Sequence, residues 1–375
     1  MPRNRIISAA EALYVGPTPA TGQHFSSGAS GVNNVVQLNR IQSCNHSWNI
    51  DRQNVNQFGQ LGYIDRISLG SPNVPLSFSY LLANFYNENQ LGFEISPNTS
   101  CISGILNRTE DEKNYFIKVA SEGDDANGSV QTSNYGNCFA FGNCFLTSYN
   151  FQASVGALPT VDIGLEGLNV SFDSGASGNN IPAVNPADGT QITTWKYQLP
   201  FTSGQQGTGD LAITVLKPGD ITVSIKEAGT ATDFNEAGIN INDAKIQSIN
   251  ISFDLSREPL QKLGSRYAFA REITFPVEVR CNLSAQVGDL TTGNLTQILC
   301  DDTAYDITVN LNKSNCTTVG DTICKYIVKN AKLDSESFSN SIGANSTVDV
   351  NFSCSLGGPS QQNLGLFLSG KGNSF

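Results

Sequence analysis

The chain has 375 residues, with 22 basic and 33 acidic side chains that give a formal net charge of −11. This charge makes tight binding to the phosphate backbone of nucleic acid unfavourable, although a surface past which DNA slides would carry the same sign. The start, Met1–Ser8, lacks the apolar core of a secretory signal, and no apolar run reaches the roughly 18 residues of a membrane helix. We therefore expect a soluble protein that is made in the cytoplasm and contacts no membrane.

Residues 1–35 are rich in turn formers, including Gly16-Pro-Thr-Pro and the Gly/Ser-rich segment from Phe25 to Gly31. A segment this short and polar cannot bury a core of its own. We expect a flexible N-terminal arm that becomes ordered only by lying on its own domain or on a neighbouring subunit.

A first β-rich domain is predicted over residues 36–175. Apolar residues alternate with polar ones, as at Val74, Leu76, Phe78 and Tyr80, which is the period of a strand with one buried face. No stretch keeps the 3.6-residue period of a helix through three turns. The strand-like runs are Gln37–Ile50, Gly62–Leu69, Val74–Leu82, Tyr115–Val119, Cys138–Val155 and Thr160–Phe172.

Residues 176–244 are predicted to link this domain to a second one. Turn formers dominate from Asp173 to Thr193, which marks a domain boundary. The alternation that follows fits either the opening strands of the second domain or a small insertion. Its runs are Trp195–Pro200, Asp210–Leu216 and Asp220–Ile225. The second domain is predicted over residues 245–375 and ends with a strand at Leu364–Leu368.

Two blocks of sequence occur twice, in the same order. Arg40–Arg52 matches Lys245–Arg257 position by position, and the loop residue Gly59 corresponds to Gly264. Two separate blocks that recur in one order are hard to obtain by chance. We therefore predict an all-β chain with two tandem copies of one β-sandwich or barrel unit that carries long loops.

The second repeated block consists of residues 149–165 and residues 336–352, which align without a gap. Alternating apolar residues flank a four-residue break that begins Gly156-Ala157 in one copy and Gly343-Ala344 in the other. This pattern is typical of two half-buried strands joined by a tight turn. Each copy is therefore predicted to form a β-hairpin.

No catalytic, cofactor-binding or metal-binding residue is predicted, and we do not expect an enzyme. His24 and His46 lie far apart in the sequence, and no nucleophile or metal motif accompanies them. Gly365–Lys371 has the glycine spacing of a phosphate loop, but Gly372 stands where Ser or Thr would hold magnesium. The acidic runs Glu110–Glu112 and Glu122–Asn127 are interpreted as solvated loops, because they lack the spacing of a calcium site.

Nine cysteines are many for a protein of the reduced cytosol. None forms the CxxC pairs of a zinc site. Buried free thiols that act as small apolar groups are the preferred interpretation, and disulfides that form after cell lysis are the alternative.

Three segments carry a resemblance to a known family: Gln37–Gln60, Asn114–Val119 and Gly142–Gly156. They resemble the major tail tube proteins of long-tailed bacteriophages. The resemblance covers most of residues 35–185 and returns in weaker form over residues 245–355. It implies β-sandwich subunits that join strands across ring interfaces and stack into a hollow virion tail tube, through which DNA leaves the capsid without specific binding.

The resemblance also implies a homo-oligomer with other tail proteins as partners and no cofactor. Because rings of this family hold six β units, we expect three copies per ring, in preference to six copies with the second unit on the outside. The lumen is expected to be acidic or neutral. The alternatives are a low-copy baseplate, hub or distal tail protein, and an immunoglobulin-like adhesin or carbohydrate-binding module, with an enzyme last.

Overall fold

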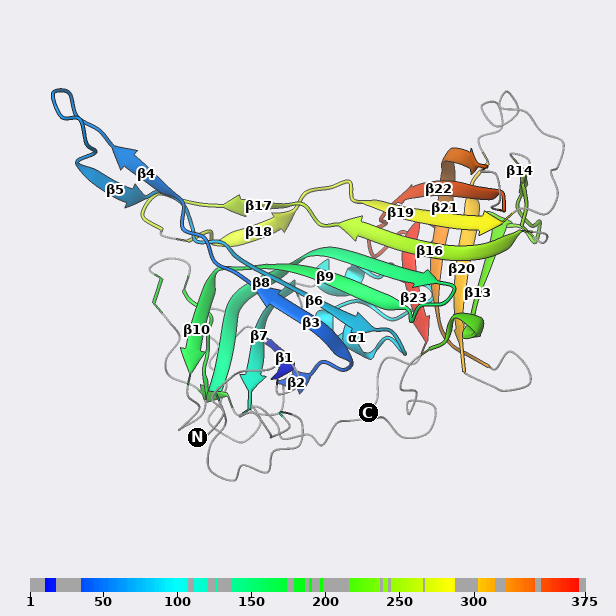
Figure 1. Ribbon diagram of the computed structural model, residues 1–375, viewed down its shortest axis with the longest axis horizontal. Coiled ribbons are helices and arrows are strands. Elements are labelled where there is room, and N and C mark those ends of the chain that lie inside the picture. Colours follow the sequence, from blue (N-terminus) through cyan, green and yellow to red (C-terminus); the bar gives the residue numbers. More distant parts are fainter. Residues whose placement is uncertain are drawn as a thin grey trace.

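Strands dominate the computed structural model, in which most strands of the described chain belong to one 15-stranded sheet (Figure 1). The all-β prediction is thereby confirmed. Four separate two-stranded sheets complete the strands of the described residues. The structure describes residues 11–17, 35–106, 111–120, 126, 137–173, 179–185, 189–190, 196–197, 216–236, 239–241, 244–265, 267–286, 303–313, 321–340 and 345–370.

The first half of the large sheet contains β1 (Glu11–Pro17), β2 (Val36–Gln37), β3 (Ile41–His46), β6 (Val74–Leu81), β7 (Glu112–Val119), β8 (Asn137–Ser154), β9 (Thr160–Gly167) and β10 (Asn169–Asp173). These strands pair in the order β3-β6-β9-β8-β7-β1-β2, and β10 pairs with the beginning of β8. The long strand β8 therefore passes from one layer, where it meets β7 and β10, to another, where it meets β9.

The second half contains β13 (Ile221–Glu227), β16 (Lys245–Asp254), β19 (Glu278–Gln286), β20 (Tyr305–Asn312), β21 (Thr322–Ser339), β22 (Thr347–Ser355) and β23 (Gly365–Gly370). Its order is β16-β19-β22-β21-β20-β13, with β23 on the beginning of β21. Apart from β2, which has no counterpart among the described strands, this order matches that of the first half. The long strand β21 takes the place of β8 (Figure 1).

Shorter elements connect these strands. The helices are α1 (Tyr86–Leu91), α2 (Ser103–Leu106) and the 3-10 helix η4 (Pro218–Asp220). The two-stranded sheets pair β4 (Arg52–Val55) with β5 (Asp65–Ser68), β11 (Asn179–Asn180) with β12 (Lys196–Tyr197), β14 (Asn235–Glu236) with β15 (Ile239–Asn240), and β17 (Arg257–Leu260) with β18 (Ala270–Ile273).

The core follows from the alternation of the sequence. Val74, Leu76, Phe78 and Tyr80 of β6 are buried, whereas Ser77 between them is exposed. Removing such a face from water contributes about 25 cal/mol per Å² of apolar surface. The larger of two hydrophobic clusters runs through both halves of the protein, and a smaller one around Tyr14 and Phe116 lies in the first half.

Local irregularities of the sheet fall at corresponding positions in the two halves. The pairing of β3 with β6 shifts register between Ile41 and Ser43, and that of β16 with β19 shifts between Ile246 and Ser248. The pairing of β8 with β9 shifts register after Leu146, and the pairing of β21 with β22 shifts register after the corresponding residue, Leu333. Bulges re-aim a strand at a defined residue, so matching bulges mean that the two sheets bend alike.

Two further backbone features also match. Asn143 in β8 and Asn330 in β21 both have positive φ, 52° and 58°. Gly59 and Gly264, in the loops between β4 and β5 and between β17 and β18, share a φ of 85°, a conformation that glycine adopts without steric cost.

Several predicted elements are confirmed, and others differ. Both repeated segments are hairpins, and β23 confirms the predicted last strand. Glu11–Pro17, assigned to the flexible arm, instead form β1, because the apolar run from Ala12 to Val15 is buried against β7. The helix α1 was not predicted, since its six residues are too few to show a period. Most of the runs predicted at 195–200 and 210–216 lie outside the described residues.

Candidate assembly surfaces

Metal-binding chemistry is absent from the part of the chain that the structure describes. There, no group of three or more His, Cys, Asp or Glu side chains could hold a metal ion. His46 lies in β3, with its ring 4.9 Å from that of Phe141, and His24 lies outside the described residues. The segment that resembles a phosphate loop forms β23. Among the described residues, no helix is long and apolar enough to cross a membrane.

The cysteines behave as small apolar residues. The seven that the structure describes have free thiols, and all of these except Cys44 are buried. Burial raises the pKa of the Cys44 and Cys354 thiols to about 12, so neither is a thiolate at neutral pH. Cys300 and Cys316 lie outside the described residues.

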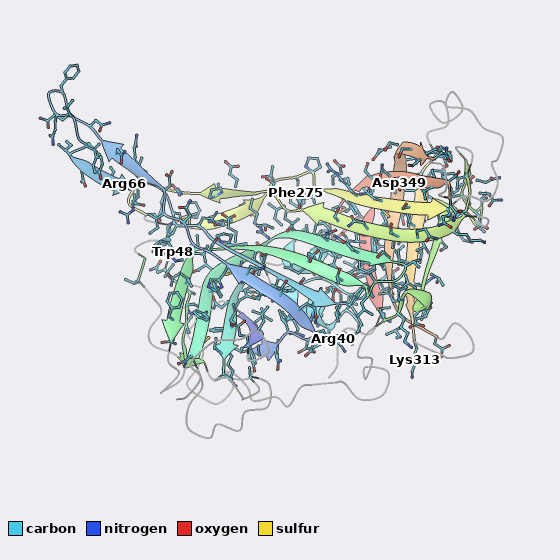
Figure 2. The ribbon with its side chains drawn as sticks, viewed as in Figure 1. Arg40, Trp48, Arg66, Phe275, Lys313 and Asp349 are labelled. Carbon is cyan, nitrogen blue, oxygen red and sulfur yellow. The ribbon has the colours of Figure 1, made fainter. Side chains whose placement is uncertain are left out.

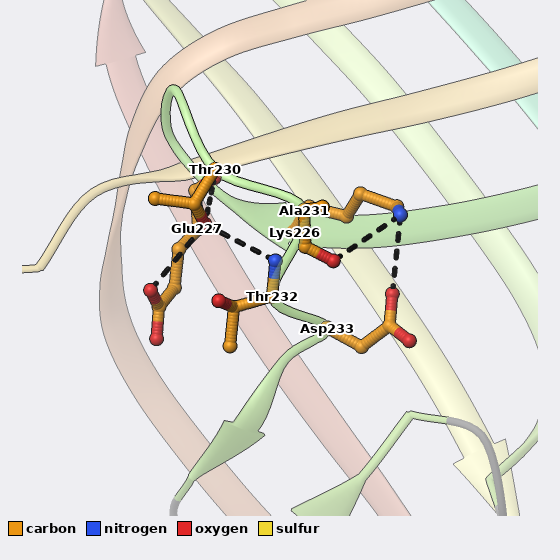
Figure 3. Close-up of polar contacts among 6 residues, drawn as sticks. All are labelled: Lys226, Glu227, Thr230, Ala231, Thr232 and Asp233. Atoms are coloured by element: carbon orange, nitrogen blue, oxygen red, sulfur yellow. Dashed lines mark hydrogen bonds and ion pairs between the residues drawn. The ribbon is translucent and has the colours of Figure 1, made fainter.

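An exposed polar cluster closes the turn after β13 (Figure 3). The Lys226 ammonium lies 3.5 Å from the Asp233 carboxylate, and the Thr230 hydroxyl donates to the Glu227 carbonyl at 3.2 Å. Both partners of the ion pair are more than two-fifths exposed. Exposed pairs of this kind contribute at most about 1 kcal/mol. The cluster therefore shapes a turn and does not form a binding site.

The two halves join edge to edge inside the chain. The second part of β8 pairs antiparallel with β16, and the opposite residues run from Ser148 with Asp254 to Ser154 with Ser248. Large side chains meet across this junction: the rings of Tyr149 and Phe253 stack with their centroids 5.4 Å apart. The junction makes one continuous wall with the strand order β3-β6-β9-β8-β16-β19-β22-β21.

A hairpin from the second half lies on the first half beside this junction. We call residues 255–275, which include β17 and β18, the docked hairpin. At its base, the Leu255 amide donates to the Thr147 carbonyl at 2.7 Å. The Arg257 guanidinium donates through Nε to the Leu146 carbonyl at 2.7 Å and through its terminal nitrogens to Asp111 at 2.6 and 3.0 Å.

These ion pairs were not found from the sequence. Asp111, interpreted as part of a solvated loop, instead binds Arg257, whose side chain is only 1% exposed. Arg271 of the same hairpin pairs with Glu166 of β9. The residues of each pair lie about a hundred or more positions apart, and no local pattern signals such a contact. The repeat offered one clue, because Arg52 and Arg66 stand at the corresponding positions of the first half.

At one end of the wall, β3 has no strand on its outer side in the described chain. The Ser47 and Asn49 amides donate inward to the carbonyls of Pro75 and Asn73. Because amide directions alternate along a strand, the N–H groups of His46, Trp48 and Ile50 point outward. Trp48 is 62% exposed at this edge (Figure 2). Such an edge is a template for pairing with another strand.

At the other end, the second part of β21 pairs with β22 and has no described strand on its opposite side. Phe338 on this part is 46% exposed, whereas its counterpart Phe151 on β8 is fully buried against Tyr326. The Glu336 Oε1 atom is buried without a hydrogen-bond partner, and burial raises the pKa of that carboxyl. Both features are typical of a strand that lacks its neighbour.

A second hairpin projects freely from the base of β3. We call residues 50–70, which include β4 and β5, the projecting hairpin; it extends away from the sheet, and Arg66 marks it in Figure 2. It exposes seven large apolar side chains, namely Ile50, Phe58, Leu61, Tyr63, Ile64, Ile67 and Leu69. Contiguous exposed apolar residues of this kind mark an interaction surface.

One face of the wall is polar along its whole length. Residues directly opposite each other in a sheet share a face, and here they are mostly Ser and Asn with some Asp. Its cations include Arg280, which Glu278 binds at 2.9 Å, and Lys332, which lies opposite Ser353. Neutral and acidic residues outnumber cations, and Asp349 lies at one end (Figure 2). Representative members are Ser43, Asn45, Ser77, Ser79, Asn150, Asp162, Asn250, Ser252, Asn282, Ser284, Asp349 and Asn351.

A buried carboxyl lies where the cores of the two halves meet. Glu88 of α1 accepts hydrogen bonds from the hydroxyls of Tyr80 at 2.7 Å and Tyr149 at 3.1 Å, and Tyr149 also bonds to the Tyr326 hydroxyl at 2.7 Å. Burial raises the pKa of Glu88 to about 7, although these hydrogen bonds oppose the shift. The group links β6, β8 and β21 through side-chain hydrogen bonds.

Comparison with known proteins gives little further guidance. No family model matches the sequence, and no curated protein matches it. Among solved structures, a chain of the cryo-EM structure of an anti-feeding prophage baseplate aligns with 40% of this chain and 92% of that chain. The sequence identity is 10% and the TM-score is 0.24. At this score the alignment supports no conclusion about fold or function.

Proposed function

We propose that the chain is a virion structural protein whose copies pair β21 with β3 and close into a ring, as the major subunit of a bacteriophage tail tube. The observation that carries the proposal is the β8–β16 junction, because it already joins two such sheets edge to edge within one chain. The free edges at β3 and β21 correspond to the two partners of that junction. Copies could therefore repeat the same contact head to tail.

The two halves are further proposed to be copies of one unit. Equal pairing order, matching bulges and matching positive-φ residues support this. If β21 and β3 pair in the register of β8 and β16, Phe338 of one copy lies opposite His46 of the next. Glu336 then lies opposite Trp48, and Ser337 opposite Ser47, as Asn150 lies opposite Ser252 within the chain.

Closure after three copies is the preferred stoichiometry. Each copy supplies the eight wall strands, so three copies give twenty-four. At about 4.8 Å per strand and a tilt of about 40°, such a barrel is about 50 Å across between backbones, wider than duplex DNA. If the polar face lines this lumen, its Ser, Asn and Asp side chains offer DNA few cationic contacts that would slow its passage.

Electron microscopy of the purified protein tests this function. We expect rings of three chains that stack into tubes. Six chains per ring, with the second half held away from the lumen, would exclude the trimer. Rings that never stack would favour the low-copy baseplate or hub alternative, and a monomer at high concentration would favour a binding module.

Cysteine cross-linking tests the register. Ser47 and Ser337 correspond to Ser252 and Asn150, whose backbone groups point away from each other, so their Cβ atoms lie close enough for a disulfide. Ser47→Cys combined with Ser337→Cys should give covalent oligomers under oxidation. The matched pair Asn150→Cys with Ser252→Cys should link within one chain and leave its mass unchanged. Equal yields from a pair displaced along the strand would contradict the register.

A further inference from the structure

We propose that the projecting hairpin of one copy lies on the second half of the adjacent copy in the same ring, in the place that the docked hairpin occupies on the first half. The inference rests on the proposed pairing of β21 with β3, since this pairing brings the adjacent second half beside the hairpin. The partner is thus a second copy of this chain, and the contact lies within a ring and not between stacked rings.

The two hairpins have the same internal geometry. Arg52 pairs with Ser68 and Val55 with Asp65 in the projecting hairpin, as Arg257 pairs with Ile273 and Leu260 with Ala270 in the docked one. Both turn through a glycine with a φ of 85°. Each follows the strand that ends the wall segment of its own half, β3 or β16, so the two hairpins leave their sheets at corresponding points.

The carbonyl that the docked hairpin binds also has a counterpart. Arg257 binds the Leu146 carbonyl, which lies just before the bulge of β8. In β21 the same place before the bulge is taken by Leu333. Arg52 of the projecting hairpin is therefore placed to donate to the Leu333 carbonyl of the adjacent copy.

Residues that are buried at the docked hairpin are exposed at the corresponding positions of the projecting hairpin, as the proposal requires. Phe253 and Leu255, at the base of the docked hairpin, are 2% and 1% exposed. Their counterparts Trp48 and Ile50 are 62% and 36% exposed. Ala268 is 2% exposed, whereas its counterpart Tyr63 is 56% exposed. Docking on a neighbour would bury this apolar surface, which is the main favourable term in association.

The acids that hold the docked hairpin are not repeated in the second half. Thr303 corresponds to Asp111, and Ser353 corresponds to Glu166. Glu336 instead offers a buried carboxylate oxygen without a partner. It would lie opposite Trp48, whose indole N–H is a donor. The proposed contact between copies would therefore contain fewer ion pairs than the contact within the chain.

The tip of the hairpin provides a control. Leu263, at the tip of the docked hairpin, stays 104% exposed although the base is buried, and its counterpart Phe58 is 104% exposed. The proposed contact therefore ends before the tip. Phe58→Ser should leave ring formation unchanged, whereas Trp48→Ala should weaken it.

A gain of affinity gives the sharpest test. Ser353→Glu places a carboxylate where Glu166 binds Arg271, so it should bind Arg66 of the adjacent copy and tighten ring association about threefold to tenfold. Arg66→Ala in the same protein should remove this gain. The double-mutant cycle separates the effect of Arg66 from that of Arg280 and Lys332, which lie opposite Ser353 within the chain. Equal association of Ser353→Glu with and without Arg66→Ala would overturn the inference.

Cross-linking in assembled rings separates the inference from the proposed function. Arg66→Cys with Ser353→Cys, joined by a short bismaleimide, should link neighbouring chains of one ring. The matched pair Arg271→Cys with Glu166→Cys should link within a chain. Normal rings that give no such product, or that give it only between stacked rings, would refute the docking and leave the function intact. Failure to form rings at all would refute both.

Discussion

Two strands of corresponding sequence, β16 and β3, differ in their pairing: β16 has a partner strand on both sides, whereas β3 pairs only with β6 in the described chain. In β16, Ile249, Ile251 and Phe253 are buried against β8. In and just after β3, the corresponding positions hold Cys44, His46 and Trp48, which are partly or largely exposed. The first strand is covered within the folded chain, and the second lies at an exposed edge of the described sheet.

Under the proposed pairing of β3 with β21, corresponding strands would serve folding in one half and assembly in the other. An edge that is paired within the chain can carry the most apolar residues, because it is never presented to other proteins. A free edge of the same composition would aggregate, and polar or amphipathic side chains reduce that hazard while keeping the backbone groups available. We therefore expect substitutions at corresponding positions to act on folding in one strand and on association in the other.

Proline at the edge should produce the largest effect. The amide of Ile251 points toward β8, and the amide of His46 points outward from the free edge. Ile251→Pro should destabilise the chain itself, because it removes a ladder bond and a buried side chain. His46→Pro should leave the monomer folded and weaken ring formation about 10- to 100-fold, measured by sedimentation, because it removes a ladder hydrogen bond and leaves the facing carbonyl without a donor, at a cost of about 1–3 kcal/mol.

Two matched variants complete this test. Phe338→Pro on the opposite free edge should act like His46→Pro, and Phe338→Ala, which keeps the amide, should act more weakly. Rings that assemble normally from His46→Pro protein would show that β3 is not the paired edge.

Replacing the corresponding arginines Arg257 and Arg52 should affect different properties: the first the stability of the chain, the second ring formation. Arg257→Ala leaves the Asp111 carboxylate, whose side chain is 22% exposed, without its partner, which should cost about 4 kcal/mol in the free energy of unfolding. Arg52→Ala should not change the monomer, measured by urea unfolding, and should weaken only the ring. A monomer destabilised equally by both substitutions would show that Arg52 already has a structural partner within the chain.

The buried carboxyl between the halves predicts a pH dependence. The pKa of Glu88 is raised to about 7 in the folded state, so the folded chain holds this proton more tightly than the unfolded chain. Its stabilisation is present below the unfolded pKa and is lost as pH rises through about 7, by roughly 3 kcal/mol in total. Glu88→Gln should flatten this decline between pH 5 and pH 8 in urea unfolding. An unchanged slope would mean that other groups cause the decline.

Much of the fold could be predicted because β structure is encoded locally. The alternation over Val74–Leu81 identifies a strand, and the two copies of the hairpin are recognisable from their turns. Short elements gave no comparable signal. The six residues of α1 are too few for a helical period, and the apolar run of β1 was hidden among turn formers.

The candidate surfaces could not be predicted, for a different reason. Repeated sequence indicates that two units are alike, but it does not say which of their edges meet. The β8–β16 junction joins residues about a hundred positions apart, and the Arg257–Asp111 pair joins residues even farther apart. Once the structure shows the first junction, the repeat leads to the proposed second pair of edges, β21 and β3.

The smallest effect is expected at the matched left-handed positions Asn143 and Asn330. Asn143 is buried, and its amide group accepts from the Val184 N–H at 2.9 Å and donates to Glu112, so Asn143→Gly should cost about 2 kcal/mol. The bond that Asn330 donates to Asp306 uses its backbone N–H, which glycine retains, so Asn330→Gly should change stability by less than about 0.5 kcal/mol. Urea unfolding of both variants measures this difference. Equal losses would mean that the backbone conformation, and not the side-chain bonds of Asn143, determines the effect at both sites.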